Sequence, residues 1–564
     1  MMLSDLITRH QSTLDAAVAA NRDRTFHAHW PEPPSGKIYG ETANDDGLKA
    51  FQDQVGKPFS GLGETLGETL GEAQRHGGNE ASPYGFNLGV TYPMWSVDEL
   101  VERASDAQVA WQALSAAERA AVLIEALERA SKRFFEIGYA TMHTTGQGFV
   151  MAFQSSGPHG FDRALEAVAM GYASQTAFAQ HVTWEKPMGK MSVVIQKTYR
   201  VVPKGINLVI GCSTFPVWNT NPGMFAGLVT GNSVIVKPHP GAIYPIAIVV
   251  AELRATLVDL GLDPNICQLA VDTVEAPVTL ELLEHPAVRI VDYTGGPVFG
   301  ATVEAACAAH GKVVYTEKAG VNNVIVESFD NADQALGNLA FSLSLYAGQM
   351  CTAPQNIYVP ASGVRVGDET WSVDEFAQHL RQHVDALVLN EKAGPSTVGT
   401  IQSAATLARV EEAKGLGLEV VRESAVVAHP GFDGARSATP LILKVDVARD
   451  DIYTREWFGP ISFIIAVDNV DDAIHRVASS IQAHGALTTL MYTTDASVMD
   501  RAEDAIVRAG APIAFNFNNF VWVNQSAAFS DFHGAGANPA GNATFADWSF
   551  VTNRFNVIGV RKQA

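Results

Sequence analysis

Short apolar runs and helix-length segments alternate along the chain from about residue 205. Strands that alternate with helices are typical of a parallel, twisted sheet covered on both faces. A second unit of the same kind is expected from about residue 321 to about residue 520. The pattern therefore predicts an α/β fold, in which ligands bind at the carboxyl ends of the strands. The predicted strands of the first unit are Gly205–Ile210, Ser233–Pro238, Cys267–Val271 and Val288–Tyr293.

Two helices upstream of this sheet have well-marked starts. Ser96 is followed by Glu99, and Ser115 by Glu118, so both segments carry a capping box that satisfies the free amides of the first turn. Apolar residues then recur at helical spacing on one face. Both helices are predicted to be scaffold without a chemical role. The residues on this face are Ala120, Leu123, Ile124, Leu127 and Phe134.

The two ends of the chain are less regular. Residues 1–90 are predicted to form an irregular extension, with an amphipathic helix rather than a signal peptide over the first ten residues. A two-unit tandem at Gly63–Leu70 is interpreted as a loop or a helix edge. Residues 181–204 predict an extended hairpin, and Phe550–Val560 predicts a closing strand.

Composition narrows the possible partners and the compartment. The chain has 564 residues, of which 47% are hydrophobic, and a net charge of −21, which disfavours nucleic acid and anionic membranes as partners. The apolar run at 243–251 is too short to span a bilayer. Only four cysteines occur, without a CxxC pair or a Cys/His cluster of zinc spacing, so we expect a reduced, cytoplasmic protein with no metal site.

Cys351 is the first candidate for chemistry. It follows Gly348 and Gln349 in a predicted turn, which exposes the sulfur as a nucleophile requires. The alternative is a buried cysteine that acts as a small apolar residue. We predict the nucleophile for Cys351 and the structural role for the other three cysteines, which lie in apolar contexts: Cys212, Cys267 and Cys307.

Glu317 lies 34 residues before Cys351 (351 − 317), at the end of a predicted strand, Val313–Thr316. A carboxylate at this position can take a proton from the thiol or from a hydrolytic water. An ordinary surface glutamate is the alternative. By itself the residue is a weak signal; Gly320 follows three residues later, and the base role is what the family resemblance described next implies.

The Cys351 turn and the Glu317 block resemble those of the aldehyde dehydrogenase superfamily, and further segments resemble its motifs in the expected order. The resemblance covers roughly residues 95–560. It implies an aldehyde-dehydrogenase-like fold with a parallel-sheet cofactor domain, an α/β catalytic domain and a small oligomerisation hairpin. The further segments are Ser213–Asn219, Gly231–Pro240, Tyr293–Gly300 and Arg455–Pro460.

The resemblance also implies domain boundaries. The N-terminal extension is 1–90, and the dinucleotide-binding domain is 91–180 with 205–320. The oligomerisation strands are 181–204 and 545–564, the catalytic domain is 321–520, and an active-site loop occupies 521–544. A homodimer or homotetramer is expected.

NADP or NAD is the implied cofactor, and the resemblance assigns its contacts to three segments. Pro240 stands where the family often has a glutamate that grips the ribose hydroxyls of NAD, so a 2′-phosphate is not repelled and NADP is favoured. Gly296 replaces a serine in the turn near the pyrophosphate. The implied contacts are Lys237, His239 and Pro240 at a strand end, Gly295, Gly296 and Gly300 at the pyrophosphate, and Glu456 and Phe458 at the nicotinamide ribose and ring.

Thr214 occupies the position of the family's asparagine, whose amide donates to the developing oxyanion. A threonine hydroxyl can donate one hydrogen bond, so Thr214 is expected to act with the Cys351 amide. Asn219 is a rival donor. Loss of an oxyanion donor costs about 100–1000-fold in rate.

The tail Phe532–Ala540 and the segment Lys237–Pro240 look like those of PaaN-type dehydrogenases of phenylacetic acid degradation. Those enzymes act on a semialdehyde that carries a coenzyme A thioester. The resemblance therefore implies a small aldehyde substrate, possibly linked to coenzyme A, oxidised to the acid.

Three other functions stay open from the sequence. An acylating dehydrogenase would use coenzyme A instead of water, and a binding protein could keep the fold without catalysis. A cysteine hydrolase would need a histidine paired with Cys351, and no histidine has a recognisable spacing from it.

Overall fold

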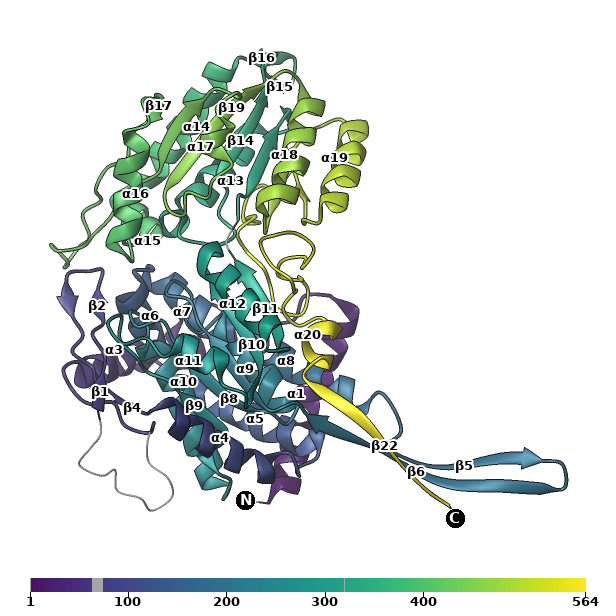
Figure 1. The fold of residues 1–564 in the computed structure, drawn as a ribbon. Coiled ribbons are helices and arrows are strands. Elements are labelled where there is room, and N and C mark those ends of the chain that lie inside the picture. Colours follow the sequence, from purple (N-terminus) through teal and green to yellow (C-terminus); the bar gives the residue numbers. More distant parts are fainter. Residues whose placement is uncertain (1, 63–74, 319, 564) are drawn as a thin grey trace.

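The computed structural model describes residues 2–62, 75–318 and 320–563. Two α/β domains lie one above the other, and a long arm projects from the lower one (Figure 1). The tandem at Gly63–Leu70 lies outside the described residues.

The lower domain contains the predicted parallel sheet. Its five strands run in the order β11-β10-β7-β8-β9, and every neighbouring pair is parallel. Every residue of β7 and β8 is buried, as expected for strands covered on both faces. The strands are β7 (Ile206–Ile210), β8 (Ser233–Lys237), β9 (Cys267–Leu269), β10 (Val288–Gly295) and β11 (Val313–Lys318).

Both predicted capping boxes are present in the helices of this domain. The Ser96 and Ser115 hydroxyls accept hydrogen bonds from the backbone amides of Glu99 and Glu118. Each glutamate side chain accepts one from the backbone amide of its serine. Phe134 differs from the prediction, because it begins α6 rather than continuing α5. The helices are α4 (Val97–Trp111), α5 (Ala116–Ser131), α6 (Phe134–Thr145), α7 (Phe149–Ser156), α8 (Pro158–Thr176), α9 (Thr220–Val229), α10 (Tyr244–Asp259), η1 (Pro264–Ile266), α11 (Thr279–Glu284) and α12 (Pro297–Ala309).

The N-terminal extension is more regular than predicted. Its first helix, α1 (Leu3–Asp23), is 21 residues long and buries Leu6, Leu14 and Ala17 against α5 and α8. The apolar spacing that marks the first ten residues as helical simply continues to residue 23, and tertiary packing stabilises the result. The extension and the segment after it also contain α2 (Gly36–Tyr39), α3 (Ala43–Gln54), β1 (Arg75–Gly77), β2 (Ala81–Ser82), β3 (Phe86–Asn87) and β4 (Tyr92–Met94).

The upper domain contains a seven-stranded sheet in the order β17-β18-β19-β14-β12-β20-β21, in which only the pairing of β17 with β18 is antiparallel. Its strands are β12 (Asn323–Val326), β14 (Asn356–Pro360), β17 (Glu419–Arg422), β18 (Leu441–Val445), β19 (Ile461–Val467), β20 (Thr489–Tyr492) and β21 (Ala514–Phe515). A small sheet is formed by β13 (Ser328–Phe329), β15 (Val364–Val366) and β16 (Glu369–Trp371). The helices are α13 (Ala332–Ser344), η2 (Leu345–Gly348), α14 (Val373–Val388), α15 (Ala393–Val398), α16 (Ala404–Lys414), α17 (Asp450–Tyr453), α18 (Val470–His484) and α19 (Ala496–Ala509).

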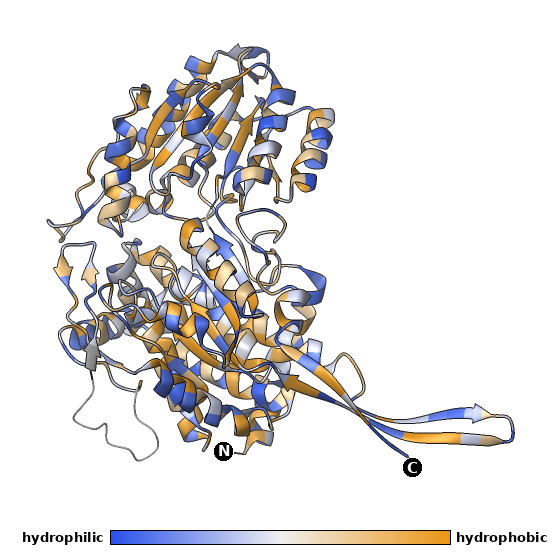
Figure 2. Ribbon diagram, in the orientation of Figure 1, coloured by the Kyte–Doolittle hydropathy of each residue, from blue (hydrophilic) through white to orange (hydrophobic). Residues whose placement is uncertain are grey.

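The arm is a three-stranded antiparallel sheet of β5 (His181–Met188), β6 (Met191–Pro203) and β22 (Phe555–Gln563). The predicted closing strand begins too early, because the Asp547 side chain caps a short helix, α20 (Trp548–Thr552), before β22 starts. Apolar residues fill the strands of both large sheets and also appear along the arm (Figure 2). Among the described residues, no helix combines the length and the apolar character needed to cross a bilayer.

Candidate active site

Cys351 lies in a turn between η2 and β14, as the sequence predicts. The chain approaches it in the left-handed region, with φ values of 51° at Tyr346, 50° at Ala347 and 65° at Gly348. A side chain at Gly348 would bring its Cβ 2.4 Å from the Gly459 carbonyl oxygen, so only glycine fits. The two non-glycine residues hold an unfavourable conformation, which the surrounding packing must maintain.

Two buried amides hold this turn. The Gln349 side chain donates to the Thr400 carbonyl (2.9 Å) and accepts from the Gln402 amide (2.9 Å). The Asn322 side chain donates to the carbonyls of Cys351 (2.8 Å) and Ala353 (3.0 Å). Its oxygen accepts from two further backbone amides, those of Leu487 and Thr488. The backbone of the cysteine is therefore fixed by neutral hydrogen bonds.

Glu317 lies near the end of β11, where the sequence places it, and is 5% exposed. Its Oε2 accepts a hydrogen bond from Asn219 Nδ2 at 3.2 Å. The residue proposed as a rival oxyanion donor is thus engaged with the carboxylate. Glu317 and Cys351 reach the same site from different domains.

A histidine completes this site. His533 Nε2 lies 3.0 Å from Glu317 Oε1 and 4.0 Å from Cys351 Sγ. The imidazole is 5% exposed, with Phe545 stacked against it and Trp218 edge-on. Glu317 and Cys351 therefore both face the same ring nitrogen of His533, Nε2.

The sequence shows no histidine at a recognisable spacing from Cys351, and the fold nevertheless brings His533 to it. His533 is 182 residues from Cys351 and 216 from Glu317, so no local spacing could reveal the contact. The available signal was the unusual tail itself, in which a histidine precedes a loop of small residues. The same three side chains are the group within the described residues that could hold a metal ion, although the sequence predicted no such cluster.

The tail loop, defined here as residues 526–546, is anchored by a buried charged pair on α8. Arg163 and Glu166 are fully buried and 2.7 Å apart. The Arg163 guanidinium also donates to the Ser526 hydroxyl (2.7 Å) and to the Asp531 carbonyl (3.2 Å). Glu166 in turn accepts from the Phe529 amide at 3.0 Å.

The N-terminal extension contributes a third charge. Arg24 donates to Glu166 (3.2 Å) and to the carbonyls of Phe529 (3.0 Å) and Ala546 (3.3 Å). Its guanidinium lies 3.8 Å from the centre of the Phe532 ring. A residue outside the two domains therefore supports the loop that presents His533.

The site favours an ionised carboxylate beside a protonated thiol. Burial, reinforced by the charge of Glu317, raises the pKa of the Cys351 thiol well above its usual value. Burial alone would raise the pKa of Glu317 too, but the charge and hydrogen bond of His533 outweigh it, and that pKa is lowered. In this state the proton rests on the sulfur, and its transfer to the adjacent carboxylate, the role of a general base, is uphill.

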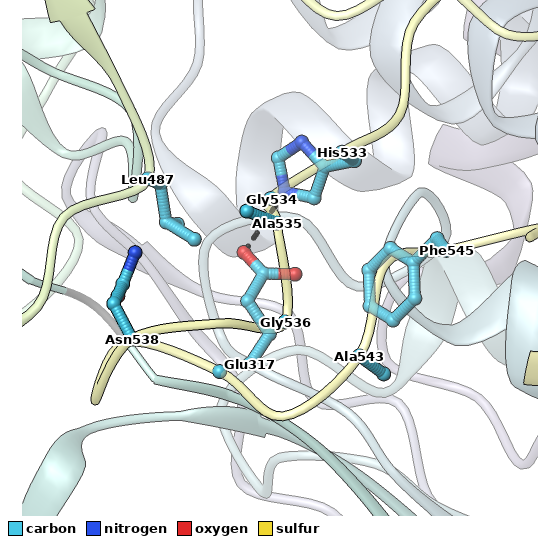
Figure 3. Close-up of a pocket in the computed structure, with 10 residues that line it drawn as sticks. Glu317, Leu487, His533, Gly534, Ala535, Gly536, Asn538, Ala543 and Phe545 are labelled. Atoms are coloured by element: carbon cyan, nitrogen blue, oxygen red, sulfur yellow. Dashed lines mark hydrogen bonds and ion pairs between the residues drawn. The ribbon is translucent and has the colours of Figure 1, made fainter. Parts of the chain in front are cut away.

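A small cavity adjoins this group, with room for a single water molecule. Glu317 and His533 line it together with Gly534, Gly536 and Phe545 of the tail loop (Figure 3). The tail loop also pairs with β11 through the Glu317–Gly541 bridge. The small residues of the tail therefore leave space beside the carboxylate.

Cys212 differs from the sequence-based expectation. It lies in the loop after β7 rather than in a strand, is half-buried, and its Sγ is 3.4 Å from Asn219 Oδ1. The Thr214 hydroxyl is 4.0 Å from this sulfur, so the predicted oxyanion donor lies in the same loop. Cys267 and Cys307 are buried, as expected for structural cysteines.

Most of the residues expected to bind a cofactor lie at or after the carboxyl ends of β8 and β10. Lys237 is 3% exposed, and its Nζ is 2.7 Å from both Asp272 and the Pro238 carbonyl. Burial lowers the pKa of Lys237, although Asp272 opposes this. The ammonium is thus engaged within the protein, whereas His239 is exposed and Pro240 half-buried.

The glycine turn after β10 is open on one side. Gly296 precedes the first residue of α12, and a Cβ built on it would meet no described atom within 4 Å. Gly300 is crowded instead, because a Cβ there would lie 2.6 Å from the Lys318 side chain. An open helix start of this kind suits the approach of a phosphate.

Glu456 and Phe458 follow α17 in the upper domain and are half-buried. Burial raises the pKa of Glu456 to about 7, although Arg409 opposes this. Arg409 also donates to the Phe458 carbonyl. Burial raises the pKa of Tyr293 on β10, and the charges of Cys212 and Glu456 raise it further.

Comparisons with known proteins agree with this geometry. Residues 94–546 match the model of the aldehyde dehydrogenase family. The chain is 44% identical to an NAD-dependent aldehyde dehydrogenase from Burkholderia multivorans, whose crystal structure superposes with a TM-score of 0.95 over 99% of both chains.

Two more distant relatives are named for semialdehyde substrates. A succinate-semialdehyde dehydrogenase [NADP(+)] from Deinococcus radiodurans is 27% identical over 79% of this chain and 86% of its own. A probable acylating methylmalonate-semialdehyde/malonate-semialdehyde dehydrogenase from Drosophila pseudoobscura pseudoobscura is 27% identical over 52% of this chain and 54% of its own. The family match covers most of the chain, and this protein belongs to the aldehyde dehydrogenase family.

Proposed function

We propose that this NAD(P)-dependent aldehyde dehydrogenase oxidises a semialdehyde to the carboxylic acid through a covalent intermediate on Cys351. The observation that carries the proposal is the half-buried thiol of Cys351 beside the buried, ionised carboxylate of Glu317. A non-catalytic binding protein would have no need to keep these two groups together. The test is the product formed by the wild type and the variant Glu317→Gln.

The residues of the chain act in a simple order. The S–H bond of Cys351 breaks as its proton moves to Glu317, and the sulfur bonds to the aldehyde carbon. The Cys351 amide and the Thr214 hydroxyl stabilise the oxyanion of the thiohemiacetal. A bound nicotinamide would supply the hydride acceptor for oxidation of this adduct to a thioester. After the carboxyl has lost its proton, Glu317 takes one from the water that releases the acid.

The residues present fit a dinucleotide, because the open side of Gly296 leaves the start of α12 free after β10. We assign Gly295, Gly296 and Gly300 to the pyrophosphate. Glu456 and Phe458 are assigned to the nicotinamide end.

NADP is our preferred cofactor, because Pro240 places no carboxylate where a 2′-phosphate would lie. The name of the Burkholderia multivorans relative favours NAD instead. The variant Pro240→Glu decides between them. If NADP is preferred, kcat/KM for NADP falls by about 10-fold or more while that for NAD is retained; equal losses for both would reject the assignment.

The substrate we propose is a semialdehyde that carries a coenzyme A thioester, of the kind formed in phenylacetate breakdown. The support is the resemblance of the tail and of Lys237–Pro240 to PaaN-type dehydrogenases. A panel of free and coenzyme A-linked semialdehydes, assayed by absorbance of the reduced nicotinamide, tests it. Equal turnover of free and coenzyme A-linked semialdehydes would reject the proposal that the substrate carries coenzyme A.

Coenzyme A as the acyl acceptor is the alternative, and the Drosophila relative is named acylating. Glu317 disfavours it, since an activated water needs a base more than a thiol does. Glu317→Gln is expected to slow acid release by about 100-fold or more. Undiminished acid release would remove the hydrolytic role, and a product that forms only with added coenzyme A would favour the alternative.

We also propose a cytoplasmic homodimer or homotetramer that assembles through the arm. Apolar side chains are exposed along its strands, which an assembly would cover. They are Met188, Met191, Val557, Ile558 and Val560. Light scattering of the wild type and of the variant Val557→Lys/Val560→Lys tests this role.

A further inference from the structure

We propose that Cys351, His533 and Glu317 form a reversible zinc site, and that the bound ion blocks the dehydrogenase. The inhibition rests on the proposed role of Cys351 as the nucleophile, whereas the binding of zinc does not. The site is assembled from the Cys351 turn, the tail loop and β11.

The three donor atoms already converge. The sulfur of Cys351, a ring nitrogen of His533 and a carboxylate oxygen of Glu317 all lie within 4.8 Å of one another. Donors on one tetrahedral zinc ion are about 3.3–3.6 Å apart, given bond lengths of about 2.3 Å to sulfur and about 2.0–2.2 Å to nitrogen and oxygen. The measured 3.0 Å from nitrogen to oxygen and 4.0 Å from sulfur to nitrogen need only small shifts.

The arrangement differs from a catalytic relay. In a relay, the nucleophile and the carboxylate bind opposite nitrogens of the imidazole. Here both Cys351 and Glu317 face Nε2. The sulfur, the ring nitrogen and the carboxylate oxygen therefore lie on the same side of the imidazole. Ligands of one ion must be arranged in this way.

The donor set selects zinc among common divalent ions. A thiolate and an imidazole suit zinc, whereas magnesium and calcium prefer oxygen ligands. Three protein ligands leave a fourth position for water. The small cavity beside Glu317 and His533 has room for it.

The surroundings hold the ligands in place. Asn219 donates to Oε2 of Glu317, which directs Oε1 toward His533. Phe545 and Trp218 pack on the His533 ring. Such outer contacts typically change metal affinity by about 10–100-fold.

The chemistry balances without an oxidant. As sulfur coordinates zinc, the S–H bond of Cys351 breaks and its proton leaves to solvent. The ion neutralises the thiolate and the carboxylate, which would otherwise repel each other. Coordination to the positive ion lowers the nucleophilicity of the sulfur and occupies the Glu317 carboxylate, so activity is lost until a chelator removes the ion.

The test measures binding and activity separately on the full-length enzyme after treatment with a chelator. Calorimetric titration with zinc chloride should give one ion per chain for the wild type. His533→Gln should weaken binding by at least about 100-fold, because it removes a direct ligand. His475→Gln, at an exposed position on α18, is the matched control and should bind as the wild type does. Equal affinity in the two variants would overturn the site.

Cobalt provides a readout on the wild type itself. The wild type loaded with Co²⁺ should show a thiolate-to-metal charge-transfer band, and Cys351→Ser should lack it. A wild-type spectrum without that band would overturn the assignment of Cys351 as a ligand. Zinc that binds the site but raises activity, or leaves it unchanged, would overturn the inhibition; loss of turnover in Cys351→Ala tests the nucleophile separately.

Discussion

Two irregular segments meet at the active site, and they are held in different ways. The Cys351 turn is fixed by neutral amides of its own surroundings, Gln349 and Asn322. The tail loop is fixed by buried charges, Arg163 and Glu166 of α8, together with Arg24 of the N-terminal extension. Neutral hydrogen bonds add modest increments, whereas an uncompensated buried charge is costly. The tail loop should therefore be the more fragile of the two.

The largest effect is expected from removal of the nucleophile. Cys351→Ala should lower kcat by more than about 10⁴-fold, because residues that act as one catalytic unit are not replaced by others. Cofactor binding, followed by fluorescence, should be retained. Cys307→Ala, a buried cysteine on α12, is the control for loss of a thiol. Turnover close to that of the wild type in Cys351→Ala would remove the role of this residue.

The second-largest effect is expected from loss of the charged pair that anchors the tail loop. Arg163→Met should lower the free energy of unfolding by about 3–5 kcal/mol, because Glu166 is left buried without its closest partner. Denaturant unfolding measures this. The double variant Arg163→Met/Glu166→Leu should recover part of the loss, since no buried charge is then left unpaired at α8. A single variant as stable as the wild type would contradict the contrast between the two segments.

Loss of the neutral hydrogen bonds that hold the Cys351 turn should lower stability less than loss of the charged pair does, but it should also slow catalysis. Asn322→Ala removes hydrogen bonds to the carbonyls of Cys351 and Ala353. We expect a loss of about 1–3 kcal/mol in unfolding free energy and about 100-fold in kcat, as a misplaced reacting group typically produces. Stopped-flow assays and thermal unfolding measure the two effects, and normal kcat would show that the turn needs no such anchor.

The smallest effect is expected from the N-terminal extension. Arg24→Ala should lower the free energy of unfolding by about 1–3 kcal/mol, because it removes charged hydrogen bonds to Glu166 and the tail loop. Arg22→Ala is the matched control, since Arg22 is 74% exposed and, within the part of the chain that the structure describes, pairs with its neighbour Asp23 alone. Equal stability of the two variants would show that the extension does not support the tail.

The sequence alone determined the α/β class, the strands of the lower sheet and the positions of Cys351 and Glu317. These features are local: an apolar run makes a buried strand, a capping box starts a helix, and a glycine permits a left-handed turn. The φ of 65° at Gly348 is such a case.

Only the tertiary structure decided which side chains meet at the sulfur. His533 reaches Cys351 across 182 residues, and Arg24 reaches the tail loop across 505. These contacts depend on how two domains and a terminal helix pack, and no local pattern encodes that packing. Burial, which sets the pKa values of Cys351 and Glu317, is likewise a property of the assembled fold.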